Sequence, residues 1–229
     1  RGGSFINTQS SLYGASGLAG VWAHENTRPA LFDAMRRKEV FATSGPKIAI
    51  RLFAGDYPDS VSVSGLASQT LYHRGVAMGN SVGPERLINN RLRLYVWAVK
   101  DQQGHNLERL QIIKGWYEDG ELKEKVFDVA CSDGTAPHPN THRCPNSSAT
   151  VDLSDCSVEL NKGNRQLATV WQDPNFDQAQ AAFYYARVLE NPSCRWTTWD
   201  ALRNDWPLLD TVPATIQERA WSSPIWYQP

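Results

Sequence analysis

The sequence of 229 residues lacks the short motifs by which many enzyme classes are recognised. It has no Gly-x-x-x-x-Gly-Lys loop for phosphate and no Gly-x-Gly-x-x-Gly fingerprint. An Asp-x-Asp-x-Asp-Gly loop is also absent, which excludes an EF-hand. We therefore expect no nucleotide-binding loop in this chain.

Strong charge and long hydrophobic runs are lacking as well. The formal net charge is −1 and no run of Lys or Arg forms a basic tract, so we expect no nucleic-acid partner. The apolar stretches are far shorter than the roughly 18 residues of a membrane-spanning helix, so we expect no membrane span. Methionine occurs only at Met35 and Met78, and the chain starts at Arg1. We expect it to be the C-terminal part of a longer protein, without a complete active site.

Aromatic residues, by contrast, are plentiful, with nine Trp, eight Tyr and seven Phe. Such side chains bury large areas and are favoured in strands. Most of them fall in segments where apolar and polar residues alternate. This pattern predicts that they belong to the core of a β-rich fold.

Cysteine is scarce but even in number, and two interpretations of it compete. In the first, two disulfides hold long loops in place, which requires an oxidising compartment; the four residues are Cys131, Cys144, Cys156 and Cys194. In the second, zinc is bound by four side chains with suitable histidine spacing, which are Cys131, His138, His142 and Cys144.

The disulfide interpretation is favoured, because no Cys-x-x-Cys pair begins a zinc site and the prolines nearby suit an irregular loop. Three pairings are possible, and we predict the two local ones, Cys131–Cys144 and Cys156–Cys194. In the chain-entropy model the first contributes about 3 kcal/mol by restricting the unfolded chain. We therefore expect a periplasmic or secreted protein, with no cofactor bound by this chain.

Residues 1–45 show a strand–helix–strand pattern typical of an α/β fold. Thr27 is a suitable N-cap, and Pro29 is tolerated in the first turn of the helix that follows. Leu31 and Met35 share one face of this helix, and we expect Arg37 and Glu39 to be solvated. The predicted elements are a strand over 18–23, a helix over 28–39 and a strand over 40–44.

From residue 46 onward the apolar residues alternate with polar ones, which is typical of strands. Asp119-Gly120 is a strong hairpin signal between two of these segments. Short strands, turn signals and almost no helical period predict an antiparallel β-sandwich over 46–229. The fold class is thus mainly β, preceded by a short strand–helix–strand remnant. The predicted strands cover 48–53, 92–98, 110–117, 122–129, 183–190 and 220–227.

The last two predicted strands are separated by nearly thirty residues. A simple hairpin loop needs only about two to five residues. We therefore interpret 191–219 as a long insertion that folds over the sheet and is tied down through Cys194.

Several segments carry a resemblance to a known family. The N-terminal ones are Gly17-Leu18-Ala19-Gly20-Val21-Trp22-Ala23, Glu25-Asn26-Thr27-Arg28 and Val40-Phe41-Ala42-Thr43-Ser44-Gly45-Pro46. The later ones are Trp97-Ala98-Val99-Lys100-Asp101, Leu110-Gln111-Ile112-Ile113-Lys114-Gly115-Trp116, Phe183-Tyr184-Tyr185-Ala186-Arg187-Val188-Leu189-Glu190 and Glu218-Arg219-Ala220-Trp221-Ser222-Ser223-Pro224-Ile225-Trp226-Tyr227. This ordered set resembles the DUF3604 family over essentially the whole chain.

The resemblance implies a longer parent protein, because DUF3604 proteins are similar to PHP-type metal-dependent phosphoesterases. Those domains bind metal through His-x-His and Asp-x-His pairings, none of which occurs here. Residues 1–45 would then be the C-terminal end of a PHP-like α/β domain. The parent protein would hold a divalent metal on ligands upstream, and the partner of residues 46–229 would be the N-terminal catalytic domain.

No catalytic residue is assigned, and few residues qualify for a binding site. Glu25 and Arg28 could reach toward a neighbouring active site, since loops between strand and helix often carry function in α/β folds. Alternatively, Glu25 simply favours the positive end of the helix that Thr27 caps. His24 stands alone between Ala23 and Glu25, and it would need upstream partners to bind metal.

Two functions fit these observations. In the first, the chain is an accessory part that supports a metal-dependent hydrolase, and its helix exposes Leu31 and Met35 where sheet partners are missing. In the second, it is a non-catalytic binding module for glycans. The second function requires at least two exposed, coplanar rings among Trp196, Trp199 and Trp206.

Overall fold

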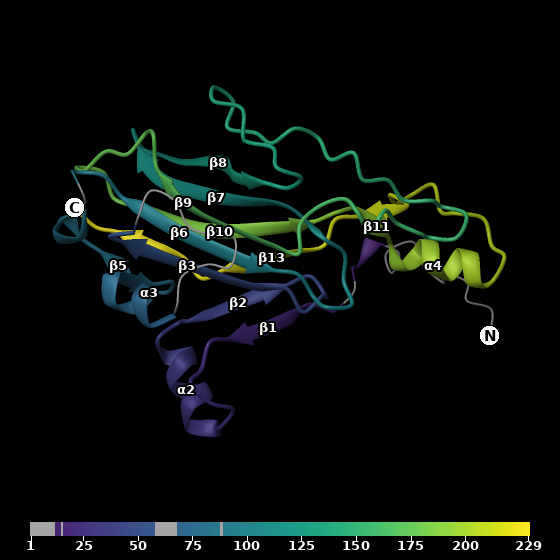
Figure 1. Ribbon diagram of the computed structural model, residues 1–229, viewed down its shortest axis with the longest axis horizontal. Coiled ribbons are helices and arrows are strands. Elements are labelled where there is room, and N and C mark those ends of the chain that lie inside the picture. Colours follow the sequence, from purple (N-terminus) through teal and green to yellow (C-terminus); the bar gives the residue numbers. More distant parts are fainter. Residues whose placement is uncertain (1–11, 15, 58–67, 88) are drawn as a thin grey trace.

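The computed structural model describes residues 12–14, 16–57, 68–87 and 89–229. The fold is built on two β-sheets whose strands run along the long axis of the molecule (Figure 1). The side chains between the two sheets form one continuous hydrophobic core. The predicted mainly β fold with antiparallel sheets is thus confirmed.

The larger sheet has eight strands, centred on the long strand β10. Its strands are β1 (Leu18–Val21), β2 (Val40–Thr43), β5 (Ser81–Val82), β7 (Leu107–Glu118), β8 (Glu121–Cys131), β10 (Ala182–Glu190), β13 (Arg219–Ser222) and β14 (Ile225–Tyr227). One side of β10 pairs with β7, which pairs with β8, and the other side pairs with β13 and then β14. From β13 the sheet continues to β2 and β1, all antiparallel, whereas β5 pairs in parallel with β14.

The smaller sheet has four antiparallel strands in the order β4-β3-β6-β9, which are β4 (Gly75–Ala77), β3 (Ala49–Gly55), β6 (Arg93–Val99) and β9 (Gln166–Gln172). Alternation along these strands turns one set of side chains toward the larger sheet. Leu52 and Val96 of this sheet and Ile112 and Val188 of the larger one are fully buried in the shared core.

The remaining elements lie at the edges of this sandwich. They are the helices α2 (Arg28–Arg36), α3 (Ser68–Arg74) and α4 (Trp196–Arg203), the 3-10 turn η1 (Pro84–Arg86), and the short pair β11 (Ser193–Cys194) and β12 (Thr215–Ile216). No helix among the described residues is long and apolar enough to cross a bilayer.

The central strands match the sequence predictions closely. The hairpin turn at Asp119-Gly120 has positive φ at both residues (52° and 82°), which is the backbone that such a pair favours between two strands. The predicted strand over 220–227 is instead two strands, β13 and β14. They are separated at Pro224, which cannot donate to a ladder.

The predicted strand–helix–strand is present as β1, α2 and β2, but the helix is shorter than expected. It ends at Arg36, because Lys38 adopts a left-handed backbone with φ of 59°. The strand β2 then pairs with β13, so this corner shares a sheet with residues far along the chain.

We expected the insertion over 191–219 to fold over the sheet, but it does not. After β10 the chain enters the ladder between β11 and β12, which places α4 beyond the ends of the sandwich strands (Figure 1). The insertion is tied down as predicted, since Cys194 forms a disulfide with Cys156.

Both predicted disulfides are present, Cys131–Cys144 and Cys156–Cys194. The alternative zinc site is therefore wrong, because both of its cysteines are consumed in one disulfide. His142 instead packs its ring against Phe127. Two disulfides are consistent with an extracellular or periplasmic location.

A buried ion pair lies between the two sheets. The Lys114 ammonium is 2.7 Å from the Asp173 carboxylate, and the Tyr184 hydroxyl donates to the same carboxylate oxygen at 2.8 Å. Lys114 also donates to the carbonyl of Asn175. Burial and the charge of Asp173 raise the pKa of Tyr184, which keeps its hydroxyl protonated as a donor.

Removing one partner of this pair should strongly destabilise the fold. We expect Lys114→Met to lower the free energy of unfolding by about 3–5 kcal/mol, because Asp173 is left charged and buried without its cation. The exposed pair of Lys123 with Glu121 provides the control, and Lys123→Met should cost less than about 1 kcal/mol. Urea denaturation of both variants tests this, and equal losses would contradict it.

Candidate functional site

A large open cavity lies beside the α2 corner, where three segments distant in sequence meet. Its volume is about 790 Å³, which is sufficient for a small-molecule ligand. The residues that line it come from the ends of β1 and α2, from β3, and from the segment between α3 and β5; they are Trp22, Ala23, His24, Arg37, Glu39, Arg51, Gln69, Tyr72, Gly75, Val76, Ala77 and Asn80.

One wall of the cavity is built by the turn between α2 and β2. Gly79 makes this possible, because a side chain there would meet Lys38 at 2.5 Å and because its φ of +87° favours glycine. Its N–H donates to the carbonyl of Pro224, which fixes the wall to the strand pair β13 and β14. The turn thereby aims Arg37 and Glu39 into the cavity.

A chain of charged and polar groups crosses the cavity floor. The Arg37 guanidinium contacts the Glu39 carboxylate at 2.8 Å, and Glu39 is only 4% exposed. The Tyr72 hydroxyl donates to Glu39 and accepts from Arg51 at 3.1 Å. Burial, followed by the bond to Glu39, raises the pKa of Tyr72 to about 12, so the hydroxyl stays protonated.

The Arg51 guanidinium also stacks on aromatic rings. It lies 4.1 Å from the ring centroid of Trp22 and 5.5 Å from that of Phe53. The Trp22 ring is itself held in place, since its N–H donates to the carbonyl of Ile50. Such stacking fixes the orientation of the guanidinium plane. The parts of the aromatic rings that the guanidinium does not cover remain apolar.

The cavity combines more positive than negative charge. Arg37 and Arg51 contribute two cations, whereas Glu39 contributes one buried anion. His24, Gln69 and Asn80 add further polar side chains to the lining. Because a guanidinium binds carboxylates and phosphates through paired N–H groups, the arrangement suits an anionic ligand with an apolar or aromatic part.

The residues predicted from sequence are only partly brought together here. His24 lines the cavity, but Glu25 and Arg28 are exposed on the corner and do not line it. Thr27 occupies the N-cap position with extended backbone, yet its hydroxyl donates to Glu25 at 2.9 Å and makes no cap bond to the helix.

The three insertion tryptophans do not form an exposed set. Trp199 is 37% exposed and lies beneath the guanidinium of Arg203. Trp196 and Trp206 are half-buried, and the Trp196 N–H donates to the carbonyl of Tyr13. The two exposed rings that a glycan platform requires are therefore not found among the three.

Sequence reasoning missed the main residues of the cavity. Arg37 and Glu39 were expected to be solvated at the end of a helix, but the early helix end turns Glu39 inward, where it is buried. Arg51 and Tyr72 lie in segments with no recognised motif. Only the pairing of β3 with β4 reveals that they are neighbours.

The comparisons with known proteins now identify the family. The profile of the family described as "Protein of unknown function (DUF3604)" matches residues 3–229. The chain belongs to the DUF3604 family. No curated protein matches this DUF3604 chain.

In the ranges that the structure describes, no three His, Cys, Asp or Glu side chains are grouped to hold a metal ion. His24 and Glu39 both line the cavity.

The hydroxyl of Tyr72 should stabilise the cavity floor. We expect Tyr72→Phe to lower the free energy of unfolding by about 1–3 kcal/mol, because the buried Glu39 loses a donor. Tyr117→Phe is the matched control; Tyr117 is 63% exposed, and its change should stay within about 0.5 kcal/mol. Chemical denaturation at pH 7 compares the two, and indistinguishable midpoints would refute the role of the network.

Proposed function

We propose that this chain is the C-terminal accessory part of a larger DUF3604 protein and supports a metal-dependent, phosphoesterase-like hydrolase. In this proposal the divalent metal and its ligands lie upstream in a PHP-like catalytic domain. The accessory part docks against that domain through its α2 corner. Its arginine-rich cavity then holds an anionic part of the substrate at the rim of the active site.

One observation carries the proposal: the corner has a charged cavity on one side and an exposed apolar face on the other. Trp22 and Glu39 line the cavity, whereas the adjacent Val21 and Val40 line an apolar groove of about 700 Å³. A domain docked on the groove would therefore lie next to the cavity. This proximity is what a shared active-site rim requires.

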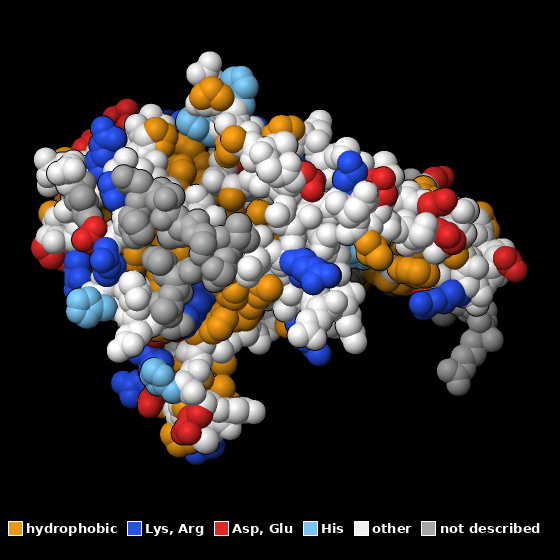
Figure 2. Space-filling view, in the orientation of Figure 1, with side chains coloured by type: hydrophobic (Ala, Val, Ile, Leu, Met, Phe, Trp, Pro, Cys, Tyr) orange, Lys and Arg blue, Asp and Glu red, His pale blue; other side chains and the backbone are white. Residues whose placement is uncertain are grey.

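The apolar face is formed by a row of side chains across three strands. Ala19, Ala42 and Trp221 are paired neighbours on β1, β2 and β13. Thr43 and Ala220, one residue further along, are buried on the opposite face, so the row points outward. Figure 2 shows the α2 corner projecting from the body of the molecule, with hydrophobic, basic and acidic side chains on its surface.

The helix α2 extends this face into solvent. Met35 is 53% exposed and Phe32 is 55% exposed, while Leu31 is half-buried and Ala34 is fully buried. Leu31 and Met35 were both expected to be exposed. Met35 is exposed, whereas Leu31 is exposed only in part. Exposed apolar side chains grouped in this way mark an interaction surface.

Charge around the helix indicates the chemistry of the partner. Arg28, Arg36 and Lys38 are exposed around α2, with Asp33 as the only acidic neighbour on the helix surface. The matching surface would be apolar at its centre and acidic at its rim, because opposite charges steer and orient association. A neighbouring domain with these features in the parent protein is the proposed occupant.

The glycan-binding alternative receives less support. It depends on exposed rings in the insertion, and only Trp199 is exposed there. The proposal also places the protein in the periplasm or outside the cell, since its disulfides persist best in an oxidising compartment. The net charge of −1 gives no support to a nucleic-acid partner.

Docking is tested by placing a charge in the apolar face. In the parent protein, we expect Met35→Glu to separate thermal unfolding into two transitions, because the accessory part no longer packs on the catalytic domain. Leu122→Glu is the control, since Leu122 is 86% exposed on β8, away from the corner. Calorimetry reports both variants, and a single unchanged transition for Met35→Glu would exclude this face as the interface.

Anion binding is tested on the purified chain with phenyl phosphate as the probe. We expect Arg37→Gln to weaken binding about tenfold, equivalent to about 1.4 kcal/mol, because one guanidinium contact is lost. Arg165→Gln serves as the control, since Arg165 is exposed and does not line the cavity. Isothermal titration at two salt concentrations measures the affinities. Identical binding by all three proteins would contradict an anion site in this cavity.

A further inference from the structure

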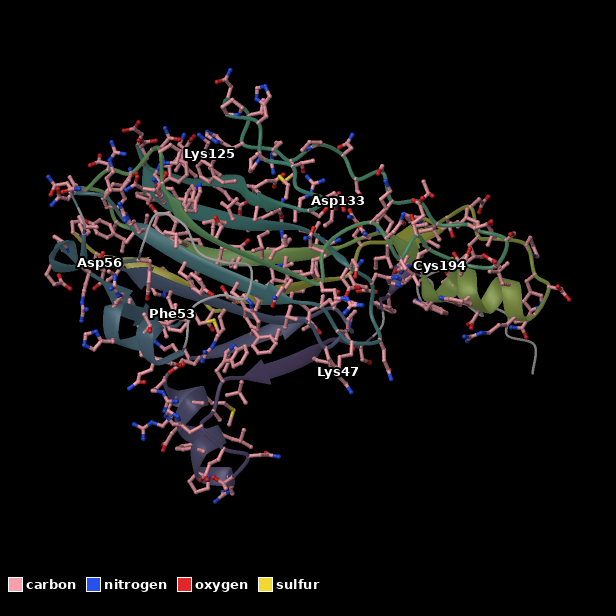
Figure 3. All side chains as sticks on the ribbon, in the orientation of Figure 1. Lys47, Phe53, Asp56, Lys125, Asp133 and Cys194 are labelled. Atoms are coloured by element: carbon pink, nitrogen blue, oxygen red, sulfur yellow. A yellow bond between two sulfur atoms is a disulfide. The ribbon has the colours of Figure 1, made fainter. Side chains whose placement is uncertain are left out.

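A second, smaller cavity lies at the opposite end of the sandwich, where β10 leads into the insertion. Its volume is about 270 Å³. Cys194, labelled in Figure 3, marks the place where the sheet, β11 and α4 meet. The residues that line the cavity are Pro46, Asp101, Gln103, Gly104, His105, Glu190, Ser193, Cys194, Trp199 and Glu218.

Glu190 lines this cavity with its carboxylate fully buried, at 0% exposure. Neither carboxylate oxygen has a partner in good hydrogen-bonding geometry among the described residues, although the backbone N–H of His105 lies close enough to lower the pKa of Glu190. The backbone of Glu190 is fixed, because its N–H donates to the carbonyl of Glu218 and its own carbonyl accepts from Gln217. A buried carboxylate without a well-formed hydrogen bond is costly unless something else satisfies it.

The groups on the loop between β6 and β7 leave the cavity negative. The Asp101 carboxylate accepts backbone N–H bonds from Lys47 and Gln103, which lower its pKa and keep it charged. The Lys100 ammonium donates to the carbonyl of Gly104, so it is not bonded to Glu190. Burial lowers the pKa of His105, which favours the neutral ring.

In the part of the chain that the structure describes, the other elements around Glu190 place no Lys or Arg side chain on the cavity lining. Glu218 precedes β13 and accepts from the Ser44 hydroxyl. On the β7 side, Glu108 forms an ion pair with Arg109 at 2.6 Å. Arg195, which follows β11, donates to the carbonyls of Leu12 and Tyr13. The acidic side chains that face the cavity thus outnumber the bases that face it.

The titration of Glu190 reflects these surroundings. Burial raises the pKa of Glu190 to about 8, with Glu218 and Asp101 adding to the rise. The N–H of His105 and the charge of Lys100 act in the opposite direction without cancelling it. Near pH 7 the carboxyl therefore holds a proton, which a bound cation would displace.

The groups that line the site favour an organic cation over a metal ion. Among the described residues no three acidic, histidine or cysteine side chains are grouped to hold a metal ion. An ammonium or guanidinium group carries several N–H donors and can satisfy both oxygens of one carboxylate. The partly exposed ring of Trp199, which already lies beneath the Arg203 guanidinium, also lines the cavity and is suited to contact a cation.

We propose that this cavity binds a small organic cation whose ammonium or guanidinium N–H groups donate to the unpartnered carboxylate oxygens of Glu190. The site is separate from the arginine-rich cavity, and it does not depend on docking of another domain. It takes ligands of the opposite charge.

The probe is methylguanidinium, titrated calorimetrically into the 229-residue chain. We expect binding at pH 7 to release up to one proton per chain, seen as a heat that differs between buffers of different ionisation enthalpy. As the pH is raised toward about 8, the affinity should increase by up to about tenfold per pH unit, because the cation binds the ionised carboxylate. Binding without proton release would overturn the proposed role of Glu190.

Two further probes separate charge from hydrogen bonding. Methylurea has similar N–H donors without charge, and tetramethylammonium has the charge without donors. Both should bind at least tenfold more weakly than methylguanidinium if the site needs both properties. Equal binding of all three probes would show a non-specific cavity and would overturn the proposal.

The matched variants are Glu190→Gln and Glu121→Gln, the latter on the exposed β7–β8 hairpin. Glutamine resembles the protonated carboxyl, so Glu190→Gln should melt within about 2 °C of the unmodified chain at pH 6. It should bind methylguanidinium more than tenfold less tightly and release no proton, whereas Glu121→Gln should behave as the unmodified chain does. If Glu190→Gln fails to fold, Glu218→Gln provides the second test, with weaker binding expected. Undiminished binding by a folded Glu190→Gln would refute the site.

A stability measurement checks the same carboxyl without ligand. Because its pKa is raised in the folded state, the stability that Glu190 contributes is fully present below the unfolded pKa near 4.5 and is lost as pH rises through about 8. The unmodified chain should therefore lose more stability than Glu190→Gln between pH 6 and pH 9. Parallel losses in both proteins would argue that the carboxylate already has a partner.

Discussion

The antiparallel pairing of β2 with β13 joins two ends of the chain that are about 175 residues apart. Thr43 and Ala220 form a buried pair at one end of this ladder, and the N–H of Ser44 donates to the carbonyl of Arg219 at 2.9 Å. Closing so long a loop costs entropy, which the ladder and the core beneath it must offset. Without this pairing β1 and α2 would have no sheet to join.

Both cavities depend on that ladder. On one side it holds the turn that carries Arg37 and Glu39, and on the other it brings Ser44 to Glu218. The positive and negative cavities are therefore fixed relative to one another by the same strands. A change that weakened the ladder would disturb both sites together.

Much of the fold was predictable, because local patterns specify the strands at its centre. The alternation in β3, β6 and β7 and the turn at Asp119-Gly120 depend on neighbouring residues alone. The strand β9 was not predicted, because its apolar residues fall in adjacent pairs and do not alternate with polar ones; it pairs with β6 at one edge of the smaller sheet. The helix α4 was missed because its proline-rich and tryptophan-rich surroundings suggested an irregular loop.

The sites were less predictable, because their residues meet only through tertiary structure. Arg51 and Tyr72 meet across β3 and α3, and Lys114 meets Asp173 across 59 residues. Glu39 was assigned to solvent on helical periodicity, but the left-handed Lys38 ends that period before it. The disulfides were predictable, since an even number of cysteines and local loop closure were sufficient.

Two edge strands of the larger sheet, β8 and β1, differ in how they would meet another chain. The edge strand β8 begins with side chains of both charges, Glu121, Lys123, Glu124 and Lys125, which resist the addition of a foreign strand. The edge strand β1 has none, as it reads Leu18-Ala19-Gly20-Val21. If β1 were left bare, self-association or sheet extension would therefore begin at this strand. A domain that covered this edge would also protect the protein from aggregation.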